Sequence, residues 1–338
     1  MAKNIVVFSD GTGQEGGEGH NTNVYKLFNM VEDRTCRQIA FYDRGLGTGW
    51  RKVTGNGAGM GISRNIQECY QFIFENYEAG DRIYLFGFSR GAATIRSLSG
   101  FIHLFGILPE SRPELIGKAY EIYRIAGREQ RIREAGSFIR RHHTMWCRIK
   151  FLGVWDTVAA LGVPFKWIDD IVECIPSFKH RFHDLQLSES VENACHALAL
   201  DDERLTFRPT LWQPDIKPWQ TMKQVWFCGM HTDVGGGYRE QQLSDISLAW
   251  MLAMAQAHGL LIYPGHKVQI NPDPNGTMHD SRGGSLTKFF RREIRAWPES
   301  HGVPTLHSSV LQRTLNQHNQ KDPPYHPWIL GHDYKVEP

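Results

Sequence analysis

Five short apolar runs recur along the chain, and polar or glycine residues follow each of them directly. Near-continuous hydrophobicity over a short run is typical of strands in a parallel sheet that is covered on both faces. Helical patterns at residues 62–77 and 92–105 separate some of the runs. The alternation predicts a doubly wound, mainly parallel α/β sheet, whose functional side chains should meet at the carboxyl ends of the strands. The five runs are residues 5–8, 38–42, 82–86, 149–154 and 224–228.

We expect residues 1–338 to form a single domain of this kind, with two helical insertions. Residues 107–148 are charged and helical in pattern, which predicts a cap or an outer helical layer. Residues 158–195 are apolar and contain two prolines. They could form a lid or an acyl-chain surface, or simply a helix packed on the sheet. Residues 315–338 are proline-rich and predict irregular coil.

Composition narrows the class of protein. Apolar residues make up 41% and charged residues 22% of the 338 residues, as in ordinary soluble enzymes. The net charge of +2 gives no electrostatic case for nucleic-acid binding. The six cysteines include no CxxC pair, so we expect neither a disulfide scaffold nor a zinc ribbon, and neither a metal nor a cofactor.

The start of the chain bears on where the protein acts. The first apolar run begins within a few residues of the N-terminus and resembles a strand rather than a signal peptide. No apolar run approaches the roughly 20 residues that a spanning helix needs. We therefore expect a cytoplasmic protein, or one secreted by a route that needs no leader.

The pentapeptide at residues 87–91 reads G-x-S-x-G, directly after an apolar run and directly before a helical pattern. A strand that turns sharply into a helix strains the serine at the bend and exposes its hydroxyl. Glycines leave room for such a bend, because a side chain there would meet the neighbouring strand or helix. The pattern predicts Ser89 as a nucleophile.

A serine nucleophile needs a base, and the base needs an orienting acid. Asp156 and Asp233 both follow apolar runs and are the acid candidates. Asp156 could instead cap a helix, and Asp233 could anchor the glycine loop that follows it. The candidate bases are His231, at the end of a run, and His307, where a late helix is expected to begin.

An oxyanion hole needs two backbone N–H groups, one of them from the residue after the nucleophile. That residue is Arg90. The second donor should come from the glycine-rich loop after the first run, at Gly11 or Thr12. This loop lacks the spacing of a phosphate-binding P-loop or of a dinucleotide fingerprint.

Six motifs together resemble the DUF2235 family, which includes the catalytic domain of the first class of type VI secretion lipase effectors. The resemblance runs from about residue 4 to residue 313. It implies an α/β-hydrolase fold and a triad of Ser89, Asp156 and His307, with His231 as the runner-up for the base. The activity implied is ester hydrolysis, as in a lipase or phospholipase. The motifs lie at residues 8–13, 42–49, 87–92, 153–158, 197–204 and 231–238.

The resemblance also sets expectations for partners. These are a lipid or small ester substrate, peripheral contact with a membrane, and an immunity or delivery partner if the protein is a secreted effector. The larger effectors carry an added membrane-associating module, and nothing of that scale is present in this chain. Both a delivered toxin and a stand-alone intracellular hydrolase therefore remain open.

Two other classes of function remain open as well. A nucleotide- or phosphate-binding domain could use the glycine loops with Asp10, Asp43 and Asp233. A metal-dependent hydrolase could be built on Asp10, Asp156, His231 and Asp233, since carboxylates and imidazoles are common metal ligands.

Overall fold

The computed structural model describes residues 2–11, 20–45, 56–158, 185–284, 290–316 and 324–338. Within these ranges, one sheet of eight strands has the order β2-β1-β3-β4-β5-β6-β7-β8, and every neighbouring pair is parallel. The strands are β1 (Asn4–Ser9), β2 (Gln38–Asp43), β3 (Arg82–Phe88), β4 (Ile149–Trp155), β5 (Asn193–Ala199), β6 (Thr221–Phe227), β7 (Thr305–His307) and β8 (Lys335–Glu337).

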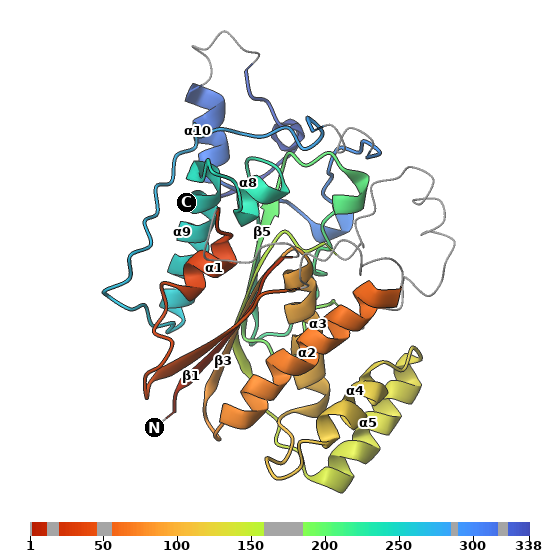
Figure 1. Cartoon of the computed structure of the whole chain (residues 1–338). Helices are drawn as coiled ribbons and strands as arrows, with labels where there is room; N and C mark the ends of the chain where they lie inside the picture. The colour runs from red at the N-terminus through yellow and green to blue at the C-terminus, as the bar shows by residue number, and fades with distance from the viewer. Residues whose placement is uncertain (1, 12–19, 46–55, 159–184, 285–289, 317–323) are drawn as a thin grey trace.

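Helices cover both faces of the sheet (Figure 1). One face carries α2 (Asn56–Asn76), α3 (Arg90–Phe105), α4 (Leu115–Tyr123) and α5 (Arg128–His142). The other carries α1 (Asn23–Phe28), α9 (Gln242–Ala257) and α10 (Ser308–Asn316). The short helix α8 (His231–Gly235) follows β6 at the carboxyl edge. The short 3-10 helices are η2 (Leu205–Phe207), η4 (Glu299–His301) and η6 (Trp328–Gly331). The doubly wound, parallel α/β class predicted from the sequence is confirmed.

The two faces have separate hydrophobic cores because side chains alternate along each strand. In β1, Ile5 and Val7 point into the core beneath α2 and α3, while Val6 and Phe8 point into the core beneath α1 and α9. Every residue of β1 is buried. This explains why the strand is apolar throughout instead of alternating with polar residues.

The sequence undercounted the strands. β5 is fully buried but consists largely of small residues, with Asn193 and His196 among them, so it lacks the β-branched signature of its neighbours. It overlaps the end of the predicted insertion at 158–195, of which residues 159–184 lie outside the described part. The expectation of irregular coil at 315–338 was wrong in part, because β8 pairs with β7 there.

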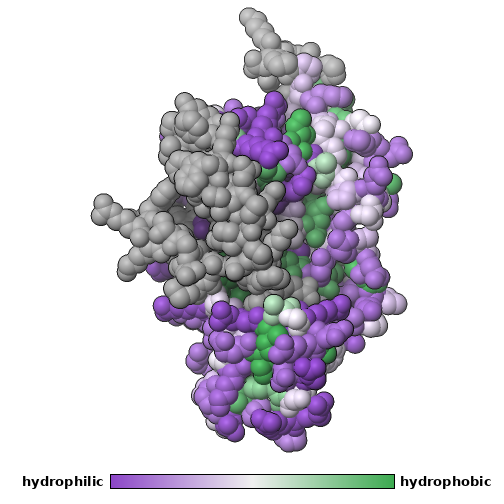
Figure 2. Space-filling view, turned by 90° about the vertical axis from the view of Figure 1, so that its right-hand side faces the viewer, coloured by the Kyte–Doolittle hydropathy of each residue, from purple (hydrophilic) through white to green (hydrophobic). Residues whose placement is uncertain are grey.

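Residues 107–148 form an outer helical layer, not a cap over the carboxyl edge. The helices α4 and α5 pack on α2 and α3 (Figure 1). In Figure 2, the part of this side that is coloured by hydropathy is largely hydrophilic, with a limited apolar area. Among the residues described, no helix combines the length and the hydrophobicity that crossing a bilayer requires.

Candidate active site

Ser89 lies between β3 and α3 in a strained backbone conformation. Its φ of 58° and ψ of −121° are values that a residue with a side chain rarely adopts. The Ser89 amide donates to the Trp155 carbonyl oxygen at 3.1 Å, which ties the bend to the end of β4. A strained serine between a parallel strand and a helix is the local geometry expected of a nucleophile elbow.

The glycines on either side of Ser89 are required by close packing, as the sequence predicts. A Cβ on Gly87 would lie 2.7 Å from the Gly91 carbonyl oxygen. A Cβ on Gly91 would lie 2.1 Å from the Ser9 carbonyl oxygen, at the end of β1. Both distances are too short for any side chain, so these glycines let α3 start directly against the sheet.

Asp156 follows β4, the strand next to β3. Phe88 pairs with Trp155 in the sheet, so Ser89 and Asp156 are the next residues on adjacent strands. Asp156 is fully buried and also has a positive φ, of 37°. Its side chain accepts hydrogen bonds from Ala199, His231 and Arg295, and the residues of a helix that it could cap lie outside the described part of the chain.

The histidine that contacts Asp156 is His231, the first residue of α8. Its Nδ1 lies 2.6 Å from Asp156 Oδ2. Phe88 packs against the imidazole at 4.6 Å between ring centroids, and Phe207 at 5.1 Å. Gly235 makes room for Phe88, since a Cβ there would lie 2.0 Å from that ring. The ring of His231 is therefore held in place by aromatic packing and one carboxylate.

The Asp156 contact also fixes the tautomer of His231. An ionised carboxylate only accepts hydrogen bonds, so the proton must be on Nδ1, which leaves a lone pair on Nε2. Burial alone would raise the pKa of Asp156, but the Arg295 guanidinium and the hydrogen bond from His231 outweigh it and hold that pKa well below its usual range. The carboxylate is thus charged at neutral pH.

His307, the base expected from the resemblance, has a different environment. It ends β7, and α10 begins at the next residue. Its Nδ1 accepts the Ser309 amide at 3.2 Å and lies 2.8 Å from Ser309 Oγ, while the ring stacks on Phe227 at 4.8 Å. Burial lowers the pKa of His307 to about 4. The structure therefore brings the runner-up, His231, to Asp156, and gives His307 a contact at the start of α10.

Asp233 makes a second carboxylate–imidazole pair. Its Oδ1 lies 2.6 Å from Nδ1 of His279, and its Oδ2 accepts the Met230 amide at 3.1 Å and the His279 amide at 3.0 Å. Asp233 therefore holds the turn before α8 and the backbone at His279, rather than the glycine loop that the sequence suggested. It does not contact His231 as an orienting acid would.

The predicted oxyanion donors are only partly in place. The Arg90 amide lies in the first turn of α3, where N–H groups have no acceptor within the helix. Gly11 lies beside Ser89, since a Cβ on Gly11 would be 3.5 Å from Ser89 Cβ. Its amide, however, donates to Asp10 Oδ1 at 2.7 Å. That contact argues against Gly11 as a donor, and Thr12 lies outside the described residues.

Sequence reasoning missed Arg295, which is 4% exposed and binds Asp156 directly. Its Nη1 donates to Asp156 Oδ1 at 2.6 Å, and its Nη2 to Asp156 Oδ2 at 2.9 Å. It comes from an irregular segment far along the chain, so no local pattern marks it. Nothing in the sequence around Arg295 distinguishes it from the other arginines of the chain.

The other carboxylates at this edge have protein partners. Asp10 accepts from Thr22 Oγ1 at 2.5 Å and from the Tyr42 hydroxyl at 2.7 Å, and burial raises its pKa to about 6. Asp43 accepts from Ser9 Oγ at 2.8 Å and Asn65 Nδ2 at 2.9 Å. Among the residues that the structure describes, no group of three or more potential ligands could hold a metal ion.

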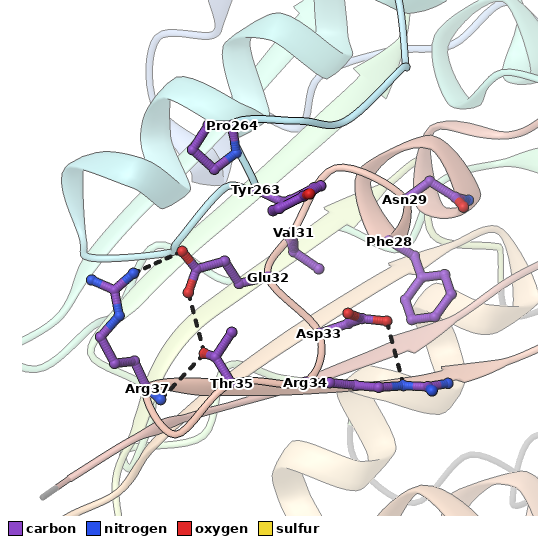
Figure 3. A pocket seen from close by; sticks show the side chains of 10 residues that line it. All are labelled: Phe28, Asn29, Val31, Glu32, Asp33, Arg34, Thr35, Arg37, Tyr263 and Pro264. Atoms are coloured by element: carbon purple, nitrogen blue, oxygen red, sulfur yellow. Dashed lines mark hydrogen bonds and ion pairs between the residues drawn. The ribbon is translucent and has the colours of Figure 1, made fainter.

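A surface hollow lies at the opposite edge of the sheet, between the segment joining α1 to β2 and residues 263–264 (Figure 3). Its charged side chains pair with one another, as Arg37 does with Glu32 at 2.8 Å. The hollow is thus separate from Ser89, Asp156 and His231, which all follow the carboxyl ends of strands.

Two proteins without a described function are similar to this chain. The uncharacterized protein YEL023C of Saccharomyces cerevisiae is 29% identical over 230 residues, which are 63% of this chain and 33% of that protein. An uncharacterized protein from Pseudomonas aeruginosa has a solved structure with a TM-score of 0.47 and 15% identity, covering 81% of this chain and 50% of that one. The chain thus spans about a third of the yeast relative and half of the bacterial one.

A second solved structure is that of the Tle1 effector bound to the VgrG spike from the type 6 secretion system. It has a TM-score of 0.38 and 20% identity, over 71% of this chain and 52% of that one. The sequence model of the type VI secretion phospholipase effector Tle1-like catalytic domain matches residues 3–254, more than half of the chain. The chain belongs to the family of Tle1-like phospholipase effector catalytic domains.

Proposed function

We propose that this protein is a serine ester hydrolase that acts on lipid esters, with Ser89 as nucleophile, His231 as base and Asp156 as orienting acid. The observation that carries the proposal is the contact of 2.6 Å between His231 Nδ1 and Asp156 Oδ2, beside a strained serine on the adjacent strand. Membership of the phospholipase effector family supports the same reaction class.

In this mechanism His231 Nε2 takes the proton of Ser89 as the hydroxyl attacks the acyl carbonyl. The ester oxygen leaves with that proton, and water then releases the acyl group by the same steps. No hydrogen bond between Ser89 and His231 is found in the described part of the chain. Catalytic hydrogen bonds are often long in the free enzyme and shorten when substrate is bound.

The geometry favours serine chemistry over the two rival classes. Both oxygens of Asp156 already accept N–H donors from His231, Arg295 and Ala199, which leaves little room for a cation. The acids proposed for phosphate or nucleotide binding, Asp10 and Asp43, are likewise satisfied by protein hydroxyls and amides.

The position of Arg90 supports the proposal that the substrate carries a negative charge. Arg90 directly follows the proposed nucleophile in the chain and is partly buried, and burial lowers the pKa of its guanidinium. Among the described residues it has no carboxylate or hydrogen-bond partner, in contrast to Arg295. Guanidinium groups bind phosphate oxygens well because their donors are planar and paired. We therefore infer that phospholipids are preferred over uncharged esters.

Turnover of a short-chain aryl ester and of a phospholipid panel tests the function. Ser89→Ala and His231→Ala should each lose about 10³-fold or more in kcat with folding intact. His307→Ala is the matched control and should retain most of its activity. Full turnover in Ser89→Ala, or loss in His307→Ala alone, would overturn the assignment.

Delivery by a secretion spike is a separate proposal. It rests on family membership and on the Tle1 effector, whose structure is of a complex with VgrG. Co-purification with a VgrG protein encoded in the same genome would support delivery. Consistent failure to bind any such spike protein would favour a stand-alone hydrolase.

A further inference from the structure

Arg295 forms two hydrogen bonds with Asp156, the acid of the proposed triad. Its two terminal nitrogens form a fork onto the two oxygens of Asp156, at 2.6 and 2.9 Å. The same nitrogens donate to the carbonyl oxygens of Ala199, at 2.5 Å, and Phe207, at 2.6 Å. A buried arginine bonded in this way has a single orientation, and so does the carboxylate that it holds.

We propose that Arg295 is a positioning residue that fixes the Asp156 carboxylate for His231 and sets the pH at which His231 becomes an active base. The inference rests on the proposed function, because it assigns His231 as that base. The carboxylate stabilises the imidazolium that forms when His231 takes a proton. A cation on the same carboxylate offsets that effect and favours the neutral, reactive ring.

The other carboxylates near His231 form ion pairs or hydrogen bonds with side chains other than the His231 ring. Asp202, after β5, accepts the His231 backbone amide at 3.2 Å and forms an ion pair with Arg204 at 2.5 Å. Asp233, in α8, is bonded to His279. The rings that pack on His231, Phe88 and Phe207, are uncharged.

Two further titratable groups lie behind the Asp156–Arg295 pair. His196, on β5, is fully buried, and burial lowers its pKa to about 3, so it is neutral. Asp201 accepts the Tyr325 hydroxyl at 2.7 Å and the Gly229 amide at 2.6 Å. Of these charged groups, only Asp156 bonds to the His231 ring, and Arg295 is the cation bonded to Asp156.

The pH dependence of kcat/KM separates this role from simple structural support. Arg295→Met removes the cation, which leaves Asp156 free to stabilise the His231 imidazolium. The acid limb of the profile should move to higher pH by roughly one unit. Arg295→Lys keeps the charge but not the fork, so its acid limb should stay near that of the wild type while kcat falls at every pH.

Arg313→Met is the matched control. Arg313 is also buried, and it donates to the carbonyl oxygens of Pro274 and Gly276 at 2.7 and 2.8 Å, but it does not contact Asp156. Its loss should lower stability without moving the acid limb. The inference is overturned if Arg295→Met leaves the acid limb in place or if Arg313→Met moves it equally. If Arg295→Met does not fold, unchanged kcat in Arg295→Lys overturns it.

A second readout needs no turnover. Titration of the His231 ring by ¹⁵N NMR in the full chain should show a higher midpoint in Arg295→Met than in the wild type. Equal midpoints would refute the role of Arg295. If the wild type hydrolyses no ester, the proposed function fails, yet this titration still decides whether Arg295 controls the protonation of His231.

Discussion

The Asp156 site predicts an unusual result for a conservative substitution. Asp156→Asn keeps the shape of the side chain but leaves one acceptor oxygen where two now receive N–H donors from His231, Arg295 and Ala199. The new NH₂ group of the asparagine would then point at one of these N–H donors, with which it cannot form a hydrogen bond. Arg295, 4% exposed, would also lose its only anionic hydrogen-bond partner in the described structure.

The magnitude follows from that unpaired charge. Removing one partner of a buried ion pair destabilises proteins by about 3–5 kcal/mol, because the other charge remains buried. We expect this loss in the free energy of unfolding of Asp156→Asn, together with loss of ester hydrolysis. In the double variant Asp156→Asn/Arg295→Met no charge is stranded, so stability should recover by about 2 kcal/mol or more, whereas activity should not.

Urea unfolding followed by tryptophan fluorescence measures the stability of the wild type, the two single variants and the double variant. Far-UV circular dichroism at zero urea serves as the folding control. The reasoning fails if Asp156→Asn unfolds within about 1 kcal/mol of the wild type, or if the double variant is no more stable than Asp156→Asn.

Three other predictions test the packing and the substrate. Gly91→Ala should abolish soluble, active protein, because its Cβ would lie 2.1 Å from a carbonyl oxygen of β1, whereas Gly136→Ala on α5 should be tolerated; equal yields of both would contradict this. Lys26→Met should cost about 3 kcal/mol in urea unfolding, since it strands Asp245 in a buried ion pair of 2.6 Å; a loss below about 1 kcal/mol would speak against it. Arg90→Gln should raise KM for anionic phospholipids more than for an uncharged aryl ester, and an equal change for both would argue against head-group binding.

Most of the sheet and the tight turn at Ser89 could be predicted from local patterns. Apolar runs followed by polar residues are strong signals, and the glycines around Ser89 mark a tight bend at which a side chain would clash. The strand β5 was missed because its small side chains, with His196 among them, carry little β propensity. Its burial comes from the helices on both faces, which sequence periodicity does not report.

The base and its surroundings could not be ranked from the sequence. His231 and His307 both follow apolar residues at the carboxyl edge. What distinguishes them is α8, which turns His231 back toward β5 and Asp156, while His307 meets Ser309 at the start of α10. The contact of Arg295 with Asp156 depends on tertiary folding across 139 positions of sequence, which no local motif encodes.

Covalent labelling by a fluorophosphonate probe tests the central claim most directly. Such a probe reacts with a serine only where a neighbouring base activates it. We expect peptide mass spectrometry to find one adduct, on Ser89, in the wild type and in His307→Ala, and labelling at least 10³-fold slower in His231→Ala. An adduct on another residue, no adduct at all, or labelling that depends on His307 instead of His231 would contradict the account.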